Sequence, residues 1–188
     1  MRLIVAITGA SGAIYGKRLI EALKERGVEV HLIVSESARF VVEHELDDPR
    51  ILEGMADRVY DPRNLSAPVT SGSFRVDGMV IVPASMKTVA AIASGYCENL
   101  VARAADVQLK ERRPLIVVPR ETPLNAIHLE NMAKLSRRGV TILPAMPGFY
   151  HRPETIGDLV DFVVGKILDQ LGLDHDLYRR WAEATGGA

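Results

Sequence analysis

Cysteine, net charge and long apolar runs are all scarce in this sequence. The single cysteine, Cys97, has no partner for an internal disulfide and excludes a multi-cysteine metal site. The 23 Lys and Arg residues nearly balance the 24 Asp and Glu residues, which leaves a net charge of −1. This balance gives no general reason to expect nucleic acid or a membrane surface as a partner, so any anion site must come from local geometry. No apolar run approaches the ~20 residues of a membrane span. We therefore expect a cytoplasmic globular protein.

Apolar runs of strand length, rich in Val and Ile, recur along the chain. They cover residues 3–7, 28–34, 78–84, 114–119 and 140–145. Continuous runs of this kind are typical of parallel strands buried on both faces, and most of the intervening segments have helical spacing. The sequence therefore predicts one α/β domain over residues 1–188. Its expected fold is a doubly wound parallel sheet of the flavodoxin or Rossmann kind, with helices on both faces.

The helices and loops between these strands can be partly placed. Stripes of apolar residues predict a helix at about Ala13–Arg26, with Gly27 as its C-cap, and another at about Glu154–Leu171. The turn-rich stretches 60–77 and 147–154 break the alternation and are expected to be functional loops. The end of the chain, about residues 183–188, is expected to fray.

The first strand runs into the glycine-rich turn "ITGASGAIYG", residues 7–16. A strand, Gly-x-x-Gly and a helix form a geometry that cradles phosphate, because backbone N–H groups and the helix dipole favour an anion at the helix start. Ser11 adds a hydroxyl donor. The alternative is that Gly9 and Gly12 serve only a tight turn and close packing. We favour the phosphate, because ligands bind such folds at the carboxyl ends of the strands.

A nicotinamide nucleotide does not fit the second strand. A dinucleotide fold needs a carboxylate at the end of that strand for the ribose hydroxyls. Here Ser35 stands at that position, and Glu36 is expected to lie already in the next helix. None of the tyrosines has a lysine four residues later, as a short-chain dehydrogenase would require.

A second group of anion-binding side chains follows the run that ends at residue 84. Ser85, Lys87 and Thr88 place two hydroxyls and an ammonium at a predicted helix start. Ordinary N-capping by Ser85 is the alternative. Two such turns on one sheet edge favour a mononucleotide site.

Four longer segments carry a family resemblance: "TGASGAIYG", "PASMKTVAAIASGYCENL", "RAADVQLKERRPLIVVPRETPLNAIHLENM" and "PAMPGFYHRPETIGDLVDFVVGKILDQLG". Together they resemble the UbiX-type flavin prenyltransferases over nearly the whole chain. The resemblance implies a flavodoxin-like, flavin-binding domain. It also implies transfer of a dimethylallyl group from dimethylallyl phosphate to N5 and C6 of reduced FMN, which yields prenylated FMN for UbiD-type decarboxylases. It further implies a metal-independent homo-dodecamer with sites at subunit contacts.

The resemblance also assigns roles to individual residues. Glu45 and Glu121 match acidic residues near the reacting flavin, with Glu45 the expected proton acceptor, and Ser11 gains a second role beside the ring. The prenyl phosphate is expected to meet Lys110, Arg120, Tyr150 and Lys166, with support from Arg103. FMN is expected to contact Gly9, Ala10, Ser11, Ser35, Ser85, Met86, Lys87, Thr88 and Arg120.

Two positions depart from the family pattern. Leu65 falls where some members have a tryptophan, and leucine cannot stabilise a cation through a π face. Lys166 stands where some members have arginine; it keeps the charge but loses the bidentate fork. A different rate or donor preference is therefore expected from Leu65, and weaker binding of the donor phosphate from Lys166.

Other functions fit the sequence less well. An FMN-dependent decarboxylase of aromatic acids or of peptidyl cysteine is the nearest rival. The cysteine decarboxylases need a Pro-x-Met-Asn motif, whereas "PAM" at 144–146 continues into Pro147. A passive FMN carrier would leave the Lys110, Arg120, Tyr150 and Lys166 group without a purpose. The five histidines form no His-x-x-x-His or Glu-x-x-His pattern, so no metal is expected.

Overall fold

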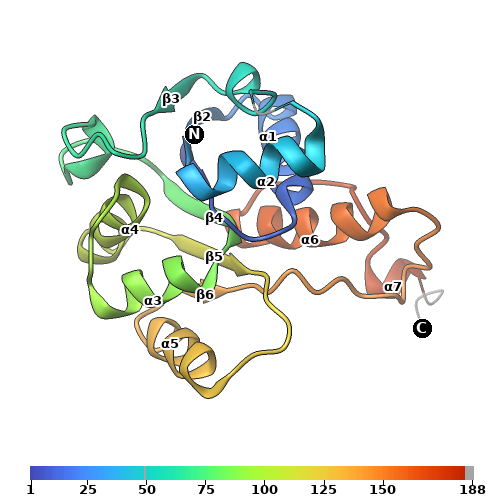
Figure 1. Ribbon diagram of the computed structural model, residues 1–188. Coiled ribbons are helices and arrows are strands. Elements are labelled where there is room, and N and C mark those ends of the chain that lie inside the picture. Colours follow the sequence, from blue (N-terminus) through green and yellow to red (C-terminus); the bar gives the residue numbers. More distant parts are fainter. Residues whose placement is uncertain (49, 185–188) are drawn as a thin grey trace. The chain divides into compact units, whose positions relative to one another are not determined.

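The structure is a computed structural model that describes residues 1–48 and 50–184 (Figure 1). The chain forms two compact units, Met1–Pro144 and the segment from Ala145 onward. Most of the C-terminal stretch predicted to fray, residues 185–188, lies outside the described residues. Residues 183 and 184 belong to a short helix.

The first unit contains one six-stranded parallel sheet in the order β3-β2-β1-β4-β5-β6. This order is that of a doubly wound sheet, so the predicted fold class is confirmed. The short edge strand β3 was missed because two of its three residues are exposed and form no apolar run. The last strand is shorter than the predicted 140–145. The strands are β1 (Arg2–Ile7), β2 (Glu29–Val34), β3 (Arg58–Tyr60), β4 (Gly78–Ala84), β5 (Leu115–Pro119) and β6 (Thr141–Ile142).

Helices cover both faces of this sheet. Helix α1 packs against α2, whereas α3 packs against both α4 and α5, and Figure 1 shows these two groups on opposite sides of the strands. Short 3₁₀ turns lie at Glu53–Met55 and Pro68–Thr70. The helices are α1 (Ala13–Glu25), α2 (Glu36–Leu46), α3 (Met86–Ser94), α4 (Leu100–Lys110) and α5 (Ala126–Ser136).

The second unit is built on α6 (Ile156–Leu171), followed by the short α7 (Trp181–Ala184). Helix α6 begins two residues later than predicted because Thr155 caps it. The Thr155 hydroxyl accepts the Asp158 N–H, and the Asp158 carboxylate accepts the Thr155 N–H in return. The predicted functional loop 147–154 precedes this cap.

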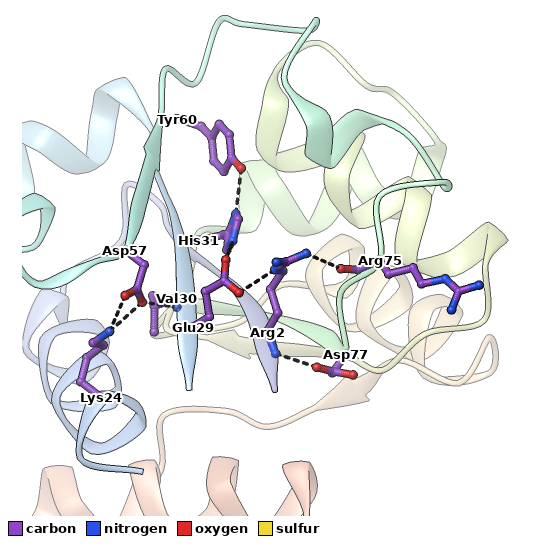
Figure 2. Close-up of polar contacts among 9 residues, drawn as sticks. All are labelled: Arg2, Lys24, Glu29, Val30, His31, Asp57, Tyr60, Arg75 and Asp77. Carbon is purple, nitrogen blue, oxygen red and sulfur yellow. Dashed lines mark hydrogen bonds and ion pairs between the residues drawn. The ribbon is translucent and has the colours of Figure 1, made fainter. Parts of the chain in front are cut away.

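A hydrogen-bond network ties the amino ends of β1 and β2 together (Figure 2). The Arg2 guanidinium donates to Glu29 at 2.9 Å, and the other Glu29 oxygen accepts from His31 Nε2 at 2.9 Å. His31 Nδ1 then accepts the Tyr60 hydroxyl at 2.8 Å, which links β2 to β3. Hydrogen bonds from His31 and Arg2 lower the pKa of the Glu29 carboxyl. His31 is therefore structural.

The central strands are buried on both faces, as the continuous apolar runs predicted. Leu3, Ile4, Val5 and Ala6 are all fully buried. On one face α1 approaches so closely that Gly16 has no room for a side chain. A Cβ there would overlap the Ile7 side chain and lie 2.8 Å from the Val82 carbonyl oxygen. The last glycine of "TGASGAIYG" therefore serves helix–strand packing.

We predict that Gly16→Ala weakens the first unit. The added methyl would displace α1 from the sheet, and overpacking of this kind lowers the free energy of unfolding by about 1–3 kcal/mol. Denaturant titration followed by circular dichroism measures the change. Gly54→Ala is the matched control, because a Cβ at Gly54 meets nothing within 4 Å. Equal stability of the two variants would contradict the packing argument.

Candidate functional site

Thr8 joins the carboxyl ends of the two central strands. Its side chain is almost fully buried; Oγ1 donates to the Pro83 carbonyl at 2.8 Å and accepts the Ser85 N–H at 2.8 Å. The turn after β1 and the turn after β4 are thereby held side by side. Sequence reasoning missed Thr8, although a threonine directly after a buried strand is a usable signal for such a bridge.

A pocket of about 490 Å³ opens at this edge of the sheet. Three helices begin at its wall, and their N-cap residues Ser35, Ser85 and Asn99 all line it. Each cap side chain accepts an N–H of its own helix: Ser35 from Ala38 at 3.2 Å, Ser85 from Thr88 at 3.4 Å and Asn99 from Ala102 at 3.0 Å. Because the N-terminus of a helix carries partial positive charge, three of them around one pocket attract an anion.

Formal charges at the pocket are paired with one another. The Lys87 ammonium lies 2.7 Å from Glu98, and Arg63 forms an ion pair with Glu36. All four residues line the pocket, so their charges cancel there. The attraction for an anion therefore comes mainly from the helix starts, in line with the nearly neutral composition.

The pocket contains some of the predicted flavin-contacting residues and others that were not predicted. Met86 instead packs its side chain into the hydrophobic core. Two signals could have found the new members: Arg63 lies in the predicted functional loop, and Asn99 stands before a helix. The predicted members are Ser35, Ser85, Lys87 and Thr88; the new ones include Ser37, Arg63, Glu98 and Asn99.

The glycine-rich turn lies beside the pocket but already holds an anion of its own. The Glu45 carboxylate, from α2, accepts the Gly12 N–H at 2.9 Å and the Ala13 N–H at 2.8 Å. Gly12 is the N-cap of α1 and has a φ of 109°, which favours glycine. The start of α1 is thus satisfied by the chain's own carboxylate, and the open helix starts are those of α2, α3 and α4.

Arg120 lies next to the same turn. It follows β5, and its Nε–H donates to the Ser11 carbonyl at 3.0 Å. Glu121 comes next and accepts the Thr122 N–H at 3.1 Å. Ser11, Glu45 and Arg120 are therefore brought together from three different segments. Gly9 and Ala10 belong to the same turn, and a Cβ at Gly9 would lie 2.7 Å from the Ser37 Cβ.

Lys110 lies near the amino ends of the strands, whereas Arg120 lies at their carboxyl ends. Helix α4 begins at the pocket and ends at Lys110, about 16 Å away by its length. There the Lys110 ammonium pairs with Glu111, and Arg113 donates to the carbonyls of Gly72 and Phe74 at 2.6 and 2.9 Å. Arg103, in the first turns of α4, pairs with Asp106 at 2.9 Å. One chain does not bring Lys110 and Arg120 together.

Tyr150 and Lys166 belong to the second unit. The Tyr150 ring packs edge-on against Phe162 and Trp181, with centroids 5.8 and 5.2 Å apart. The Lys166 ammonium lies 3.3 Å from the Asp169 carboxylate. Both predicted donor-binding residues are therefore fixed by neighbours within their own unit.

Several other kinds of site find no support in residues 1–48 and 50–184. No group of three or more His, Cys, Asp or Glu side chains in these ranges could hold a metal ion. Nor does any helix there have the length and apolarity needed to cross a membrane. Burial raises the pKa of the Cys97 thiol, which disfavours the thiolate that a nucleophile requires.

A parallel sheet with an anion-attracting pocket at the carboxyl ends of its strands defines a nucleotide-binding α/β protein. Comparison with known proteins narrows this class. The family model described as Flavoprotein matches residues 1–168. The flavin prenyltransferase UbiX of Methanothermobacter thermautotrophicus is 53% identical over 180 residues, which cover 95% of this chain and 94% of that protein.

Two crystal structures superpose closely on the chain. The dodecameric FMN-dependent UbiX-like decarboxylase from Escherichia coli O157:H7 has a TM-score of 0.94 and 51% identity, and the match covers 96% of this chain and 99% of that one. AnUbiX (PadA1), in complex with FMN and dimethylallyl pyrophosphate, has a TM-score of 0.94 and 48% identity, with 96% of each chain covered. The chain belongs to the UbiX flavin prenyltransferase family, so the resemblance found in the sequence is confirmed.

Proposed function

We propose that the chain is a flavin prenyltransferase that joins a dimethylallyl group from dimethylallyl phosphate to N5 and C6 of reduced FMN. The observation that carries this proposal is the pocket at the starts of α2, α3 and α4, with Ser11, Glu45 and Arg120 beside it. The product, prenylated FMN, would pass to a UbiD-type decarboxylase.

The pocket fits the phosphate end of FMN. Its volume of about 490 Å³ lies within the range of small-molecule sites, and helix starts favour a phosphate dianion. The hydroxyls of Ser35, Ser37, Ser85 and Thr88 would complete the phosphate site. When bound, FMN supplies the ring that accepts the prenyl group. The turn Gly9–Ser11 and Arg120 would hold the ring side of the molecule.

Glu45 would accept the proton that leaves C6 when the second bond forms. Its Oε2 takes two hydrogen bonds, from Gly12 and Ala13, whereas Oε1 takes only a longer one of 3.1 Å from Gly12. Oε1 is therefore the oxygen with free capacity for a proton. The backbone N–H groups keep the carboxylate oriented beside Ser11, and Glu121 adds a second acidic group after Arg120.

Fixed cations would stabilise the phosphate that leaves the allylic group. Arg120 and Lys166 are proposed for this role, with Lys110 and Arg103, and the Tyr150 hydroxyl would donate a neutral hydrogen bond to the same phosphate. Within one chain Lys110 lies near the amino ends of the strands and Arg120 at their carboxyl ends. We therefore infer that a neighbouring subunit supplies Lys110. A homo-dodecamer, the assembly named for the Escherichia coli relative, would bring these edges together.

Two substitutions relative to some family members would tune this site. Lys166 offers one rotatable ammonium in place of a bidentate guanidinium. Leu65 is half exposed and has no π face to place beside a cation. The expected consequences are weaker binding of the donor phosphate from Lys166 and a different rate or donor preference from Leu65.

The test of the proposed function is anaerobic incubation of the protein with reduced FMN and dimethylallyl phosphate. We expect mass spectrometry of the extracted flavin to show a gain of one five-carbon unit. Incubation without the donor is the control. No gain in mass would refute prenyl transfer. Release of carbon dioxide from an aromatic acid by the protein alone would favour the decarboxylase named for the Escherichia coli relative.

We predict that Glu45→Gln binds FMN but stalls after the first bond. The amide cannot take up a proton, and its NH₂ group faces backbone donors, so the cap of α1 is also weakened by about 0.5–2 kcal/mol. Stopped-flow absorbance separates the two bond-forming steps, and thermal unfolding measures the loss of stability. Glu43→Gln, on the same helix, is the control. An unimpaired second step in Glu45→Gln would exclude it as the proton acceptor.

A shared site also predicts complementation between inactive variants. Lys110→Ala and Arg120→Ala should each lose prenyl transfer, because each removes a cation from every site. When the two variants are unfolded together and refolded as mixed assemblies, about one site in four regains both residues. The measurement is activity of the mixture against either variant refolded alone. A mixture that stays inactive would contradict the assignment of Lys110 to a neighbouring subunit.

A further inference from the structure

The segment after α6 packs tightly back onto that helix. We call residues 175–181 the C-terminal strap. His175 has a fully buried side chain, and Tyr178 is nearly as buried. A Cβ at Gly165 would lie 2.6 Å from the Tyr178 ring and 2.7 Å from the His175 ring. Helix α6 therefore carries a glycine where the strap makes its closest approach.

Asp169 fastens the strap through its carboxylate. Oδ1 accepts from His175 Nε2 at 3.1 Å and from Arg180 at 2.9 Å, and Oδ2 accepts the Tyr178 hydroxyl at 2.9 Å. The same carboxylate holds the Lys166 ammonium at 3.3 Å. Burial alone would raise the pKa of the Asp169 carboxyl, but hydrogen bonds from Arg180, Tyr178 and Lys166 hold it well below its usual range. The carboxylate is therefore ionised at neutral pH.

The strap also holds the loop that carries Tyr150. The Arg179 guanidinium donates to the His151 carbonyl at 3.2 Å. The Trp181 ring packs against Tyr150, and Tyr178 packs against Phe162 with ring centroids 4.9 Å apart. Asp169 thus contacts Lys166 directly and, through the strap, supports the loop that carries Tyr150, 16 positions earlier in the sequence.

We propose that Asp169 is a positioning residue for the prenyl donor, because its carboxylate fixes both the Lys166 ammonium and the strap that supports Tyr150. This inference rests on the proposed function, which gives Tyr150 and Lys166 their contact with the donor phosphate.

Charge and conformational entropy explain why the Asp169 carboxylate would strengthen binding of the donor phosphate. One carboxylate faces two permanent cations, Lys166 and Arg180, so positive charge remains for a phosphate. A lysine on a flexible stem must otherwise be ordered when the ligand binds, which costs affinity. Asp169 orders it in advance. The loss of Asp169 should therefore weaken donor binding without touching the flavin pocket, whose lining lies in the first unit.

The test compares Asp169→Asn with Asp158→Asn in the full chain. Both acidic residues lie on α6, but the Asp158 carboxylate accepts the backbone N–H groups of Glu154 and Thr155, at the other end of the helix from the strap. Calorimetry measures the Kd of dimethylallyl phosphate, fluorescence measures FMN binding, and steady-state kinetics separates KM from kcat. We expect Asp169→Asn to raise the donor Kd and KM about tenfold, as the loss of a charge-assisted hydrogen bond implies. FMN binding and kcat at saturating donor should stay near those of the unmodified protein.

The conservative variant Asp169→Glu should recover part of the donor affinity, whereas Asp158→Asn should leave it unchanged. Equal loss of donor affinity in Asp169→Asn and Asp158→Asn would overturn the proposal, because general weakening of α6 would then explain both. A lower unfolding temperature for Asp169→Asn with an unchanged donor Kd would also overturn it.

The two proposals fail in different ways. If the unmodified protein binds dimethylallyl phosphate more tightly than Asp169→Asn does but never prenylates FMN, the proposed function is wrong and the positioning role stands. If it prenylates FMN and Asp169→Asn binds the donor normally, the positioning role alone is wrong. Failure of the unmodified protein to bind the donor at all would overturn both.

Discussion

The buried hydroxyl of Thr8 is the contact on which the arrangement at the carboxyl ends of the strands depends. It donates to the Pro83 carbonyl and accepts the Ser85 N–H, so β1 and β4 end in fixed register. In a parallel sheet every crossover helix that follows a strand starts at the same edge, which gathers helix starts there. The bridge sets how closely the turn after β1 meets the start of α3. Both the pocket and the Ser11–Arg120 contact lie next to it.

The second constraint is that the pocket attracts anions although the formal charges that line it cancel. The pocket pairs Lys87 with Glu98 and Arg63 with Glu36, and leaves the attraction to backbone dipoles. The start of α1 is the exception, because Glu45 already occupies it. One glycine-rich turn thereby holds the acidic group of the site, while the neighbouring turns remain open to a phosphate.

In the second unit, charges are likewise paired within the chain, and one carboxylate is the common partner. The Asp169 carboxylate accepts hydrogen bonds from a lysine, a histidine, a tyrosine and an arginine, and so fixes the strap against α6. Gly165 permits that approach. Lys166, which is proposed to bind the donor phosphate, is thus held by a partner within its own unit.

The sequence by itself determined the doubly wound sheet, the α1 and α6 helices and the family, because these depend on local periodicity and on long matching segments. It also identified Ser35 and Ser85, which stand directly after strands. It did not reveal the Thr8 bridge, the Asn99 cap at the pocket, Glu45 at the start of α1 or the Asp169 cluster. Those contacts join residues from different segments, and their partners become neighbours only when the chain folds. The separation of Lys110 from Arg120 likewise follows from the direction of α4 and β5 in space, which no spacing along the chain encodes.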